Sequence, residues 1–485
     1  MAHAWGEREA TVKSVNLLIG ERDAIAAHGR TFDPMTGEIA SRAAAASVAD
    51  ARAAADAAAA AFPEWSALGP SERRAMLLRA ADLMEKSGDE FAETMLVETG
   101  GTAPWAHFNT HLAAGMLREA AAMTTQITGE VIPADKPNSF AMAIREPAGV
   151  CLGIAPWNAP VILGTRAIAM PLACGNTVVL KASEQCPATH RLIGTVLREA
   201  GIPAGVINVV TNAPSDAAPV IEALIAHPAI RRVNFTGSTR VGRIIAATAG
   251  RHLKPVLLEL GGKAPLVILD DADIDEAVSA AAFGAFANAG QICMSTERIV
   301  VVDAVADAFV EKFAAPAGDP RGHVVIGCMV NPDAARHVKS LIDDAVEKGA
   351  TMVCGGDFNG TVLNATILDR VGPAMRIYAE ESFGPVTTVV RVKDVGEAVR
   401  TANDTEYGLS AAVFGRNITR ALAVAKQIQS GICHINAPTV HDEAQMPFGG
   451  VKASGYGRFG GKAAIAEFTE LRWITIQTGP HPYPF

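Results

Sequence analysis

Between residues 150 and 259, short apolar runs alternate along the chain with longer segments in which apolar residues follow a helical spacing. Runs of the first kind are typical of buried strands, and segments of the second kind are typical of amphipathic helices. The predicted strands are Val150–Ile154, Thr177–Lys181, Val206–Val210, Arg232–Thr236 and Pro255–Glu259, and the helices between them include one from Pro160, Leu192–Ala200, Val220–Ala226 and Thr239–Thr248. This alternation predicts an α/β fold with a parallel, doubly wound sheet.

A second alternating series follows Gly262 and predicts a second α/β domain. Its strands are expected at Val267–Leu269, Ile299–Val302, Val386–Val392 and Ala411–Phe414. We therefore predict a first domain from residues 1–124 and 148–258 and a second from residues 259–453.

Upstream of both series, the alanine-rich segment Ala43–Ala61 and a segment in which Ser71 would cap a helix are expected to be packing helices. Two further segments, residues 125–147 and 465–485, fit neither series. Their strand-like parts predict a small β element that serves subunit contacts, so we expect a homodimer or homotetramer.

Composition supports a globular enzyme, because 49% of the residues are hydrophobic and 19% are charged, with 44 Gly and 27 Pro. The net charge of −9 comes without a long basic run, so neither nucleic acid nor an anionic membrane is an expected partner. The amino terminus has no apolar core of an export signal, and prolines interrupt the apolar stretch after Val150. We therefore expect a cytoplasmic protein.

The seven cysteines are far apart, form no CxxC pair and accompany no histidine cluster with metal-ligand spacing. They indicate reduced thiols and no metal site. Any one of them could be a small buried hydrophobe, so a catalytic cysteine has to be recognised from its surroundings.

A nucleotide site is expected beyond the carboxyl ends of the first set of strands, where open α/β sheets bind ligands. Gly237 and Ser238 follow one strand and Gly242 lies in the next helix, so a phosphate could approach that helix terminus, although a glycine turn with a serine cap fits the same residues. Lys181 and Glu184 follow another strand and suit the two hydroxyls of a ribose, although a solvated surface pair fits equally well. Glu184 would repel a 2′-phosphate, which favours NAD over NADP.

Three polar residues occupy positions where active sites form. Cys293 lies on a connection between a probable helix, Asp275–Ala287, and a strand, where a thiol is more accessible than in a core strand. Glu259 ends a strand, and Asn158 follows another, where it could also be a helix N-cap before Pro160.

Several motifs, in the same order, make the chain from about Phe32 to Trp473 similar to the aldehyde dehydrogenase superfamily. They are PWNAPV at 156–161, KASE at 181–184, FTGSTRVG at 235–242, LELGGK at 258–263, GQIC at 290–293, EESFGPV at 380–386 and PFGG at 447–450. The segments after Trp157 and after Cys293 most resemble the bacterial salicylaldehyde and vanillin dehydrogenase branch.

The resemblance implies that Cys293 is the nucleophile, that Asn158 and the Cys293 N–H form the oxyanion hole, and that Glu259 is the general base. It implies an NAD-binding domain in residues 1–124 and 148–258, a catalytic domain in 259–453 and bridging strands in 125–147 and 465–485. It also implies that NAD contacts Trp157, Lys181, Glu184, Gly237, Ser238, Gly242, Glu381 and Phe383. One departure concerns the acid that many hydrolytic members carry after the Gly-Arg behind PFGG, because Phe459 stands there.

The expected substrate is an aromatic aldehyde, with Arg166 near the tunnel that leads to Cys293 and able to hydrogen-bond a polar ring substituent. The other expected pocket residues are Trp105, Ala159, Leu163, Met294 and Phe448. Arg166 could instead be a structural ion-pair partner. The alternative functions are an aliphatic semialdehyde dehydrogenase, a non-catalytic member of the fold and a thioesterase-like hydrolase without nucleotide.

Overall fold

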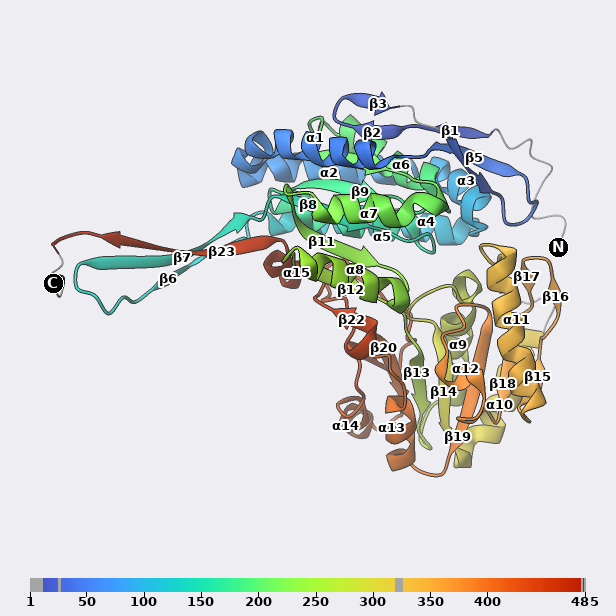
Figure 1. The fold of residues 1–485 in the computed structure, drawn as a ribbon. Coiled ribbons are helices and arrows are strands. Elements are labelled where there is room, and N and C mark those ends of the chain that lie inside the picture. The colour runs from blue at the N-terminus through green and yellow to red at the C-terminus, as the bar shows by residue number, and fades with distance from the viewer. Residues whose placement is uncertain (1–11, 25–27, 319–325, 481–482, 484–485) are drawn as a thin grey trace.

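A computed structural model describes residues 12–24, 28–318, 326–480 and 483 (Figure 1). Two α/β lobes lie one above the other, and a narrow β arm projects sideways from the upper lobe. Each lobe is built on its own sheet, as the two alternating series predict.

The upper lobe contains an eight-stranded sheet. In spatial order its strands are β22 (Gly455–Tyr456), β12 (Val256–Glu259), β11 (Ile230–Thr236), β8 (Val150–Ile154), β9 (Thr177–Lys181), β10 (Ile207–Val210), β2 (Leu17–Ile19) and β3 (Arg22–Ala24). The five central strands, β12 to β10, are parallel, which confirms the predicted doubly wound core. Each predicted strand of the first series is present.

Helices cover both faces of this sheet because alternate strand residues point to opposite sides. One buried cluster joins the sheet to α2 (Pro70–Lys86), α3 (Gly88–Thr99), α4 (Ala103–Met123), α5 (Pro160–Ala173) and α6 (Pro187–Glu199). A second cluster joins the other face to α1 (Val48–Ala67), α7 (Ala217–Ala226) and α8 (Thr239–Arg251). The site residues that follow the strands therefore stand on a rigid base.

The lower lobe contains a seven-stranded sheet. Its order is β15 (Thr351–Cys354), β18 (Thr366–Asp369), β19 (Val386–Val392), β14 (Thr296–Val302), β13 (Ala264–Ile268), β20 (Ser410–Phe414) and β21 (Ile432–Ile435). The helices of this lobe are α9 (Ile274–Phe286), α10 (Asp303–Gly318), α11 (Pro332–Glu347), α12 (Arg376–Ala379), α13 (Val395–Asn403) and α14 (Ile418–Ala425). All strands from β18 to β21 are parallel, so the second series is confirmed as a second α/β unit.

The arm is a three-stranded antiparallel sheet of β6 (Glu130–Ile132), β7 (Ser139–Pro147) and β23 (Thr469–Gln477) (Figure 1). It joins the two segments that fit neither alternating series, as far as the described residues extend. Small sheets also form from β1 (Lys13–Val15), β5 (Ile39–Ala44) and β4 (His28–Phe32), and from β16 (Phe358–Asn359) and β17 (Val362–Leu363).

Two local features differ from the sequence prediction. Ser71 is not a helix cap: α2 begins at Pro70, and the Gly69 N–H donates to Glu72 at 2.9 Å. The chain also returns from the lower lobe to the upper sheet, where β22 pairs antiparallel with β12 and α15 (Gly461–Glu467) follows. This return was missed because a two-residue strand has no periodicity to detect.

Candidate active site

Residues from three separate connections meet between the two lobes. Glu259 is the last residue of β12, Asn158 lies between β8 and α5, and Cys293 lies between the 3₁₀ turn η2 (Ala287–Gly290) and β14. Because β12 and β8 flank β11 as parallel strands, their carboxyl ends open at the same edge of the upper sheet. The connection that carries Cys293 comes to this edge from the lower lobe.

Glu259 is a buried acid without a hydrogen-bond partner. Its residue is 1% exposed, and neither carboxylate oxygen has a complete hydrogen bond among the described residues. Burial raises the pKa of Glu259 to about 7, although the neighbouring Cys293 thiol favours the charged form. Arg166 also favours the charged form and Asp442 opposes it. A carboxyl group with a pKa near neutrality can accept a proton and release it again.

Cys293 is distinguished from the other cysteines by the adjacent Glu259 carboxyl and not by a lowered thiol pKa. Burial, followed by the charge of Glu259, raises the pKa of the Cys293 thiol well above its usual value. Burial also raises the thiol pKa of the other cysteines, so this shift does not single out Cys293. The thiol beside an unpaired carboxylate is the distinguishing feature.

The connection to Cys293 passes close to the glycines of the LELGGK motif. A Cβ on Gly262 would lie 2.2 Å from the Cys293 carbonyl oxygen, and a Cβ on Gly261 would lie 2.6 Å from a carboxylate oxygen of Glu381. The Gly262 N–H donates to Glu381 at 2.8 Å. These glycines therefore allow the chain that follows Glu259 to lie against the cysteine loop.

Asn158 is buried and is not a helix cap, since the N-cap of α5 is Ala159 and Pro160 is its first residue. The Asn158 side-chain amide donates to the Gln291 carbonyl at 2.9 Å, which ties it to the cysteine loop. Its own carbonyl accepts from Trp105 Nε1 at 3.1 Å and from Asn288 Nδ2 at 2.9 Å.

Asn288 and Gln291 are positioning residues that the sequence did not reveal. Asn288 has a left-handed backbone with φ 49°, which asparagine tolerates better than most residues. The Gln291 side chain donates to the Asn288 carbonyl at 3.2 Å and to the Cys328 carbonyl at 3.1 Å. It also accepts from the Val330 N–H at 2.9 Å. The GQIC motif contained a signal for Gln291, because this polar residue stands two positions before the candidate nucleophile Cys293.

Lys181 and Glu184 form an ion pair at the carboxyl end of β9. Burial is the largest single influence and favours the neutral acid, but the charge and hydrogen bond of Lys181, together with hydrogen bonds from the Glu184 backbone and Asn212, lower the pKa of Glu184. Asn212, which follows β10, donates to the same carboxylate at 2.8 Å. The pair is largely buried, with side-chain exposures of 5% and 22%, so it is not the solvated surface pair considered from the sequence.

Ser238 is the N-cap of α8, where its hydroxyl accepts from the Val241 N–H at 3.4 Å. The Gly237 N–H donates to the Glu259 carbonyl at 3.0 Å and is therefore already used. A Cβ on Gly237 would lie 2.5 Å from the Phe235 ring, and a Cβ on Gly242 would lie 2.4 Å from Leu260. Both glycines permit close packing at the end of β11.

The segment that contains Glu381 and Phe383 is fixed by a buried ion pair between Lys263 and Glu297. Lys263 Nζ lies 2.5 Å from Glu297, which also accepts from the Phe383 N–H at 3.0 Å. Phe383 meets Trp157 edge to face, with ring centroids 5.7 Å apart. Burial raises the pKa of Glu381 to about 8. The Lys263–Glu297 pair could not be predicted from local patterns, because its two residues are 34 positions apart.

The predicted pocket residues divide between two neighbouring apolar clusters. Ala159 and Leu163 are buried in one cluster, and Met294 and Phe448 are buried in the other. Trp105 packs against both clusters, and Cys293 packs against the second. Trp105 also stacks on Phe108 with centroids 5.5 Å apart. Cys293 therefore packs against the apolar cluster that contains Met294 and Phe448.

Arg166 forms a buried ion pair with Asp442. Its guanidinium carbon lies 4.2 Å from the centroid of the Phe448 ring and 5.9 Å from that of Phe459. The sequence did not reveal Asp442, which is 276 positions from its partner. An ion pair was one of the two roles considered for Arg166, and the structure shows it. The other role, contact with a substrate, stays a prediction.

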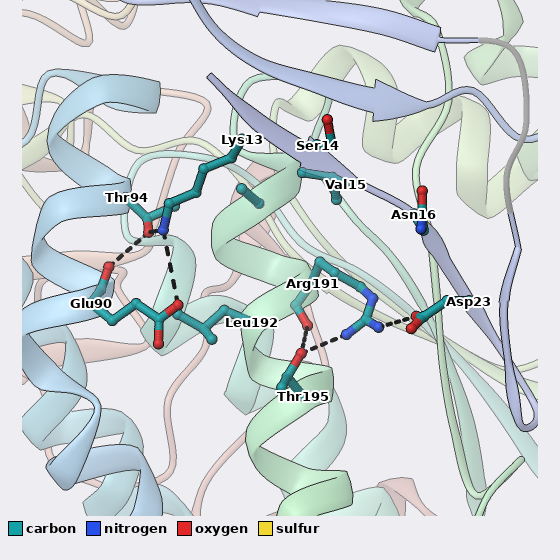
Figure 2. A pocket seen from close by; sticks show the side chains of 11 residues that line it. Lys13, Ser14, Val15, Asn16, Asp23, Glu90, Thr94, Arg191, Leu192 and Thr195 are labelled. Atoms are coloured by element: carbon teal, nitrogen blue, oxygen red, sulfur yellow. Dashed lines mark hydrogen bonds and ion pairs between the residues drawn. The ribbon is translucent and has the colours of Figure 1, made fainter. Parts of the chain in front are cut away.

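A separate cavity of about 250 Å³ lies among β1, α3 and α6 and contains none of the predicted site residues (Figure 2). Its basic groups already have partners, since Lys13 Nζ donates to the Thr94 hydroxyl at 2.7 Å and Arg191 pairs with Asp23.

No group of three or more His, Cys, Asp or Glu in the described part of the chain is arranged to hold a metal ion. None of the described helices is both long and apolar enough to cross a membrane.

A profile of the aldehyde dehydrogenase family matches residues 23–474. A vanillin dehydrogenase from Pseudomonas sp. is 62% identical over 97% of this chain and 99% of its own length. A salicylaldehyde dehydrogenase from Pseudomonas putida is 53% identical over 94% of this chain and 96% of its own length. The crystal structure of a salicylaldehyde dehydrogenase from Pseudomonas putida G7, complexed with salicylaldehyde, matches 98% of this chain and 100% of that chain with a TM-score of 0.95 and 51% identity. Together with the cysteine, acid and amide between the lobes, these matches show that the chain belongs to the aldehyde dehydrogenase family.

Proposed function

We infer that this protein oxidises aromatic aldehydes to carboxylic acids with NAD, through a thioester on Cys293. The observation that carries the chemistry is the buried Glu259 carboxyl. It has no hydrogen-bond partner in the described structure, and its charge helps to raise the pKa of the neighbouring Cys293 thiol. The aromatic substrate class is supported by the vanillin and salicylaldehyde dehydrogenases that match nearly the whole chain.

The nucleotide fits the carboxyl edge of the upper sheet. Lys181 and Glu184 provide a donor and an acceptor for ribose hydroxyls at the end of β9. Ser238 caps α8, whose first N–H groups suit a pyrophosphate. We assign Trp157, Glu381 and Phe383 to the nicotinamide end and Gly237 and Gly242 to the close packing behind the pyrophosphate. NAD, when bound, accepts the hydride that leaves the aldehyde carbon.

The first step forms a bond between the Cys293 sulfur and the aldehyde carbon, which converts the carbonyl oxygen to an oxyanion. The Cys293 N–H and the second hydrogen of the Asn158 amide stabilise that oxyanion, since the first amide hydrogen is held by Gln291. The thiol proton has to leave first, and Glu259 is the adjacent acceptor.

The second step hydrolyses the thioester. Glu259 first releases the thiol proton to solvent and then accepts a proton from the attacking water; the carbon–sulfur bond breaks, and this second proton passes to the Cys293 thiolate to restore the thiol. Phe459 occupies the position where many relatives carry a second acid, so this chain has no proton relay from that residue. Glu259, with a pKa of about 7, carries the proton itself.

Trp105, Ala159, Leu163, Met294 and Phe448 are the proposed apolar walls for an aromatic ring, with Arg166 near its polar substituent. An aliphatic semialdehyde dehydrogenase is less well supported, because Arg166 is already neutralised by Asp442 and a distal carboxylate would approach that acid. The intact Cys293, Glu259 and Asn158 argue against a non-catalytic role. The buried ion pair at the ribose position argues against a hydrolase without nucleotide.

We also propose that residues 1–124 and 148–258 form the NAD-binding domain, that residues 259–453 form the catalytic domain, and that the arm joins subunits in a homodimer or homotetramer. The arm exposes apolar side chains, including Val131, Leu471 and Trp473, with exposed fractions of 69%, 62% and 75%. A cytoplasmic location is proposed from the free cysteines.

Steady-state NADH formation tests the function, with benzaldehyde, the hydroxybenzaldehydes, vanillin and aliphatic semialdehydes as substrates. We expect the specificity constants for the aromatic aldehydes to exceed those for the semialdehydes. The opposite order would overturn the aromatic assignment, and esterase activity without NADH formation would overturn the dehydrogenase assignment.

A further inference from the structure

One acceptor beside the predicted pocket residue Arg166 has no donor. Asp442 lies in the loop after β21, and its Oδ2 accepts from the Arg166 guanidinium. The Asp442 side chain is only 9% exposed, and its Oδ1 is buried and has no hydrogen-bond partner in the described structure. A buried carboxylate oxygen without a donor is unfavourable, and such an atom commonly marks a place where a ligand completes the hydrogen bond.

The loop that carries Asp442 is held against the cysteine loop. The Thr439 hydroxyl donates to the Met294 carbonyl at 2.7 Å and lies 2.8 Å from the Thr296 hydroxyl. Met294 directly follows Cys293 in the sequence. The loop that carries Asp442 is therefore held against the segment that directly follows Cys293.

The Arg166–Asp442 ion pair lies close enough to Glu259 for the charges of both its residues to act on that acid. The charge of Arg166 also acts on Cys293. Phe448, a proposed wall of the ring pocket, lies under the guanidinium at 4.2 Å. An aromatic ring beside Phe448 would present its substituents to this pair.

We propose that Asp442 determines specificity for hydroxylated aromatic aldehydes, by accepting at Oδ1 a hydrogen bond from a hydroxyl group on the ring. Arg166 is the positioning residue that holds the carboxylate in place by donating to Oδ2. The proposal rests on the aromatic substrate class inferred above and names the group that the site selects within it.

The chemistry of this acceptor separates related substrates. A phenolic hydroxyl donates to a carboxylate, whereas a methoxy group in its place has no hydrogen to donate. An unsubstituted ring leaves Oδ1 without a partner, as in the free protein. A carboxylate on the substrate would be repelled by Asp442.

The test compares kcat/KM for benzaldehyde with kcat/KM for each hydroxybenzaldehyde isomer and the matching methoxybenzaldehyde. In Asp442→Asn the amide oxygen can face Arg166, which turns the NH2 group toward the ring, so the charged acceptor of the hydroxyl proton is replaced by a neutral donor that forms only a weaker bond to the hydroxyl oxygen. We expect the ratio of hydroxybenzaldehyde to benzaldehyde to fall about tenfold for at least one isomer, through KM more than kcat. The ratio of methoxybenzaldehyde to benzaldehyde should not fall.

A double variant, Arg166→Met with Asp442→Leu, covers the case in which the single variant fails to fold, because removing both charges leaves neither buried without a partner. It should lose the same hydroxyl preference. Asp82→Asn is the matched control, since Asp82 pairs with Arg118 on an exposed surface and should leave the ratios unchanged.

Two failures can be told apart. If the wild-type enzyme oxidises semialdehydes and no aromatic aldehyde, the proposed function is wrong. If it oxidises benzaldehyde and the hydroxybenzaldehydes, but neither variant lowers any hydroxyl ratio, the role of Asp442 is wrong and the proposed function stands. Titration of the Cys293→Ala enzyme with NAD and the same aldehydes gives a second readout, because the hydroxyl preference should appear in Kd and disappear with Asp442→Asn.

Discussion

Two equally buried glutamates, Glu98 and Glu259, are used in opposite ways in this molecule. Each residue is 1% exposed. Glu98, at the end of α3, accepts from the Ser41 hydroxyl at 2.7 Å, from the Ala188 and Thr189 N–H groups at 2.9 Å, and from the Thr189 hydroxyl at 2.8 Å. Glu259, between the lobes, has no such partner in the described structure.

The difference teaches that the bonding of a buried acid, more than its burial, indicates its role. Burial raises the pKa of both glutamates. Glu98 uses its oxygens to hold the amino terminus of α6 against α3, so a reaction there would disrupt the packing of two helices. Glu259 keeps both oxygens available to a thiol and to water.

The largest expected effect comes from the other member of the reactive pair. Cys293→Ala should abolish steady-state NADH formation, because no other group of the site can form the thioester. NAD binding should change little, since the thiol does not hold the dinucleotide. NADH formation and NAD titration measure the two properties separately, and substantial dehydrogenase activity in this variant would contradict the mechanism.

Glu259→Gln tests the reactive acid directly. The amide cannot accept a proton from water, so thioester hydrolysis should slow by about 10²–10⁴-fold, while thioester formation is impaired less. Rapid mixing should show a burst of NADH followed by slow turnover. Loss of the burst together with turnover would mean that solvent cannot replace Glu259 as the acceptor of the Cys293 proton.

Glu98→Gln is the matched control in the comparison. The new NH2 group faces the backbone donors at the start of α6, and each lost hydrogen bond to the charged group costs about 1.5–3 kcal/mol. The urea midpoint of unfolding should fall, and the folded variant should keep the NADH kinetics of the wild type, without the burst and slow turnover expected for Glu259→Gln. An unchanged urea midpoint would show that the hydrogen bonds of Glu98 do not stabilise the fold, which would contradict the contrast drawn between Glu98 and Glu259.

The pH dependence follows from the same acid. Glu259 must be deprotonated to act as a base, and its pKa is raised to about 7, so the rate of hydrolysis should rise as pH increases through 7. Between pH 5 and pH 7 the deprotonated fraction grows by roughly fiftyfold. The slow turnover of Glu259→Gln should lose this rise, and a wild-type midpoint near 4.5 would show that the acid is not desolvated during turnover.

Much of the fold and the three reacting residues could be predicted from the sequence. Both parallel sheets follow from alternating strands and helices, because local periodicity carries that information. Cys293, Glu259 and Asn158 could be assigned only through family resemblance, since a cap or a core cysteine has the same local pattern. The contact between Glu259 and Cys293 confirms that they are neighbours, but their roles stay predictions.

The residues that the sequence did not reveal act through distant partners. Asp442 becomes meaningful only beside Arg166, and Lys263 only beside Glu297. Asn288 serves the site through a left-handed backbone and a bond to the Asn158 carbonyl. No periodicity reports such pairs, because they depend on how separate connections converge between the lobes.

The proposed ribose position offers a third acid, which is largely buried and has a partner of its own. Glu184 is held by Lys181 and should disfavour the 2′-phosphate of NADP through repulsion between poorly solvated charges. We expect kcat/KM for NAD to exceed that for NADP by about tenfold or more. Glu184→Ala should narrow this difference. Equal use of both nucleotides by the wild type would show that Lys181 dominates.

The smallest expected effect concerns Arg166, which forms the buried ion pair with Asp442 at the proposed substrate site. A hydrogen bond that involves a charged group contributes roughly 1.5–3 kcal/mol. Arg166→Ala should therefore lower kcat/KM for the preferred hydroxybenzaldehyde by about tenfold. Benzaldehyde, which lacks the hydroxyl group, should lose less.

Arg166→Lys separates a specificity role from a structural one. Lysine keeps the positive charge beside Asp442 but lacks the planar fork of the guanidinium, so it should restore part of the hydroxyl preference. An arginine that only supports α5 would affect both aldehydes equally, because α5 begins directly after Asn158 and Ala159 and a displaced helix would misplace the oxyanion hole for every substrate. Equal losses for benzaldehyde and hydroxybenzaldehyde in Arg166→Ala would therefore assign Arg166 to structure and leave the chemistry of Cys293 and Glu259 unaffected.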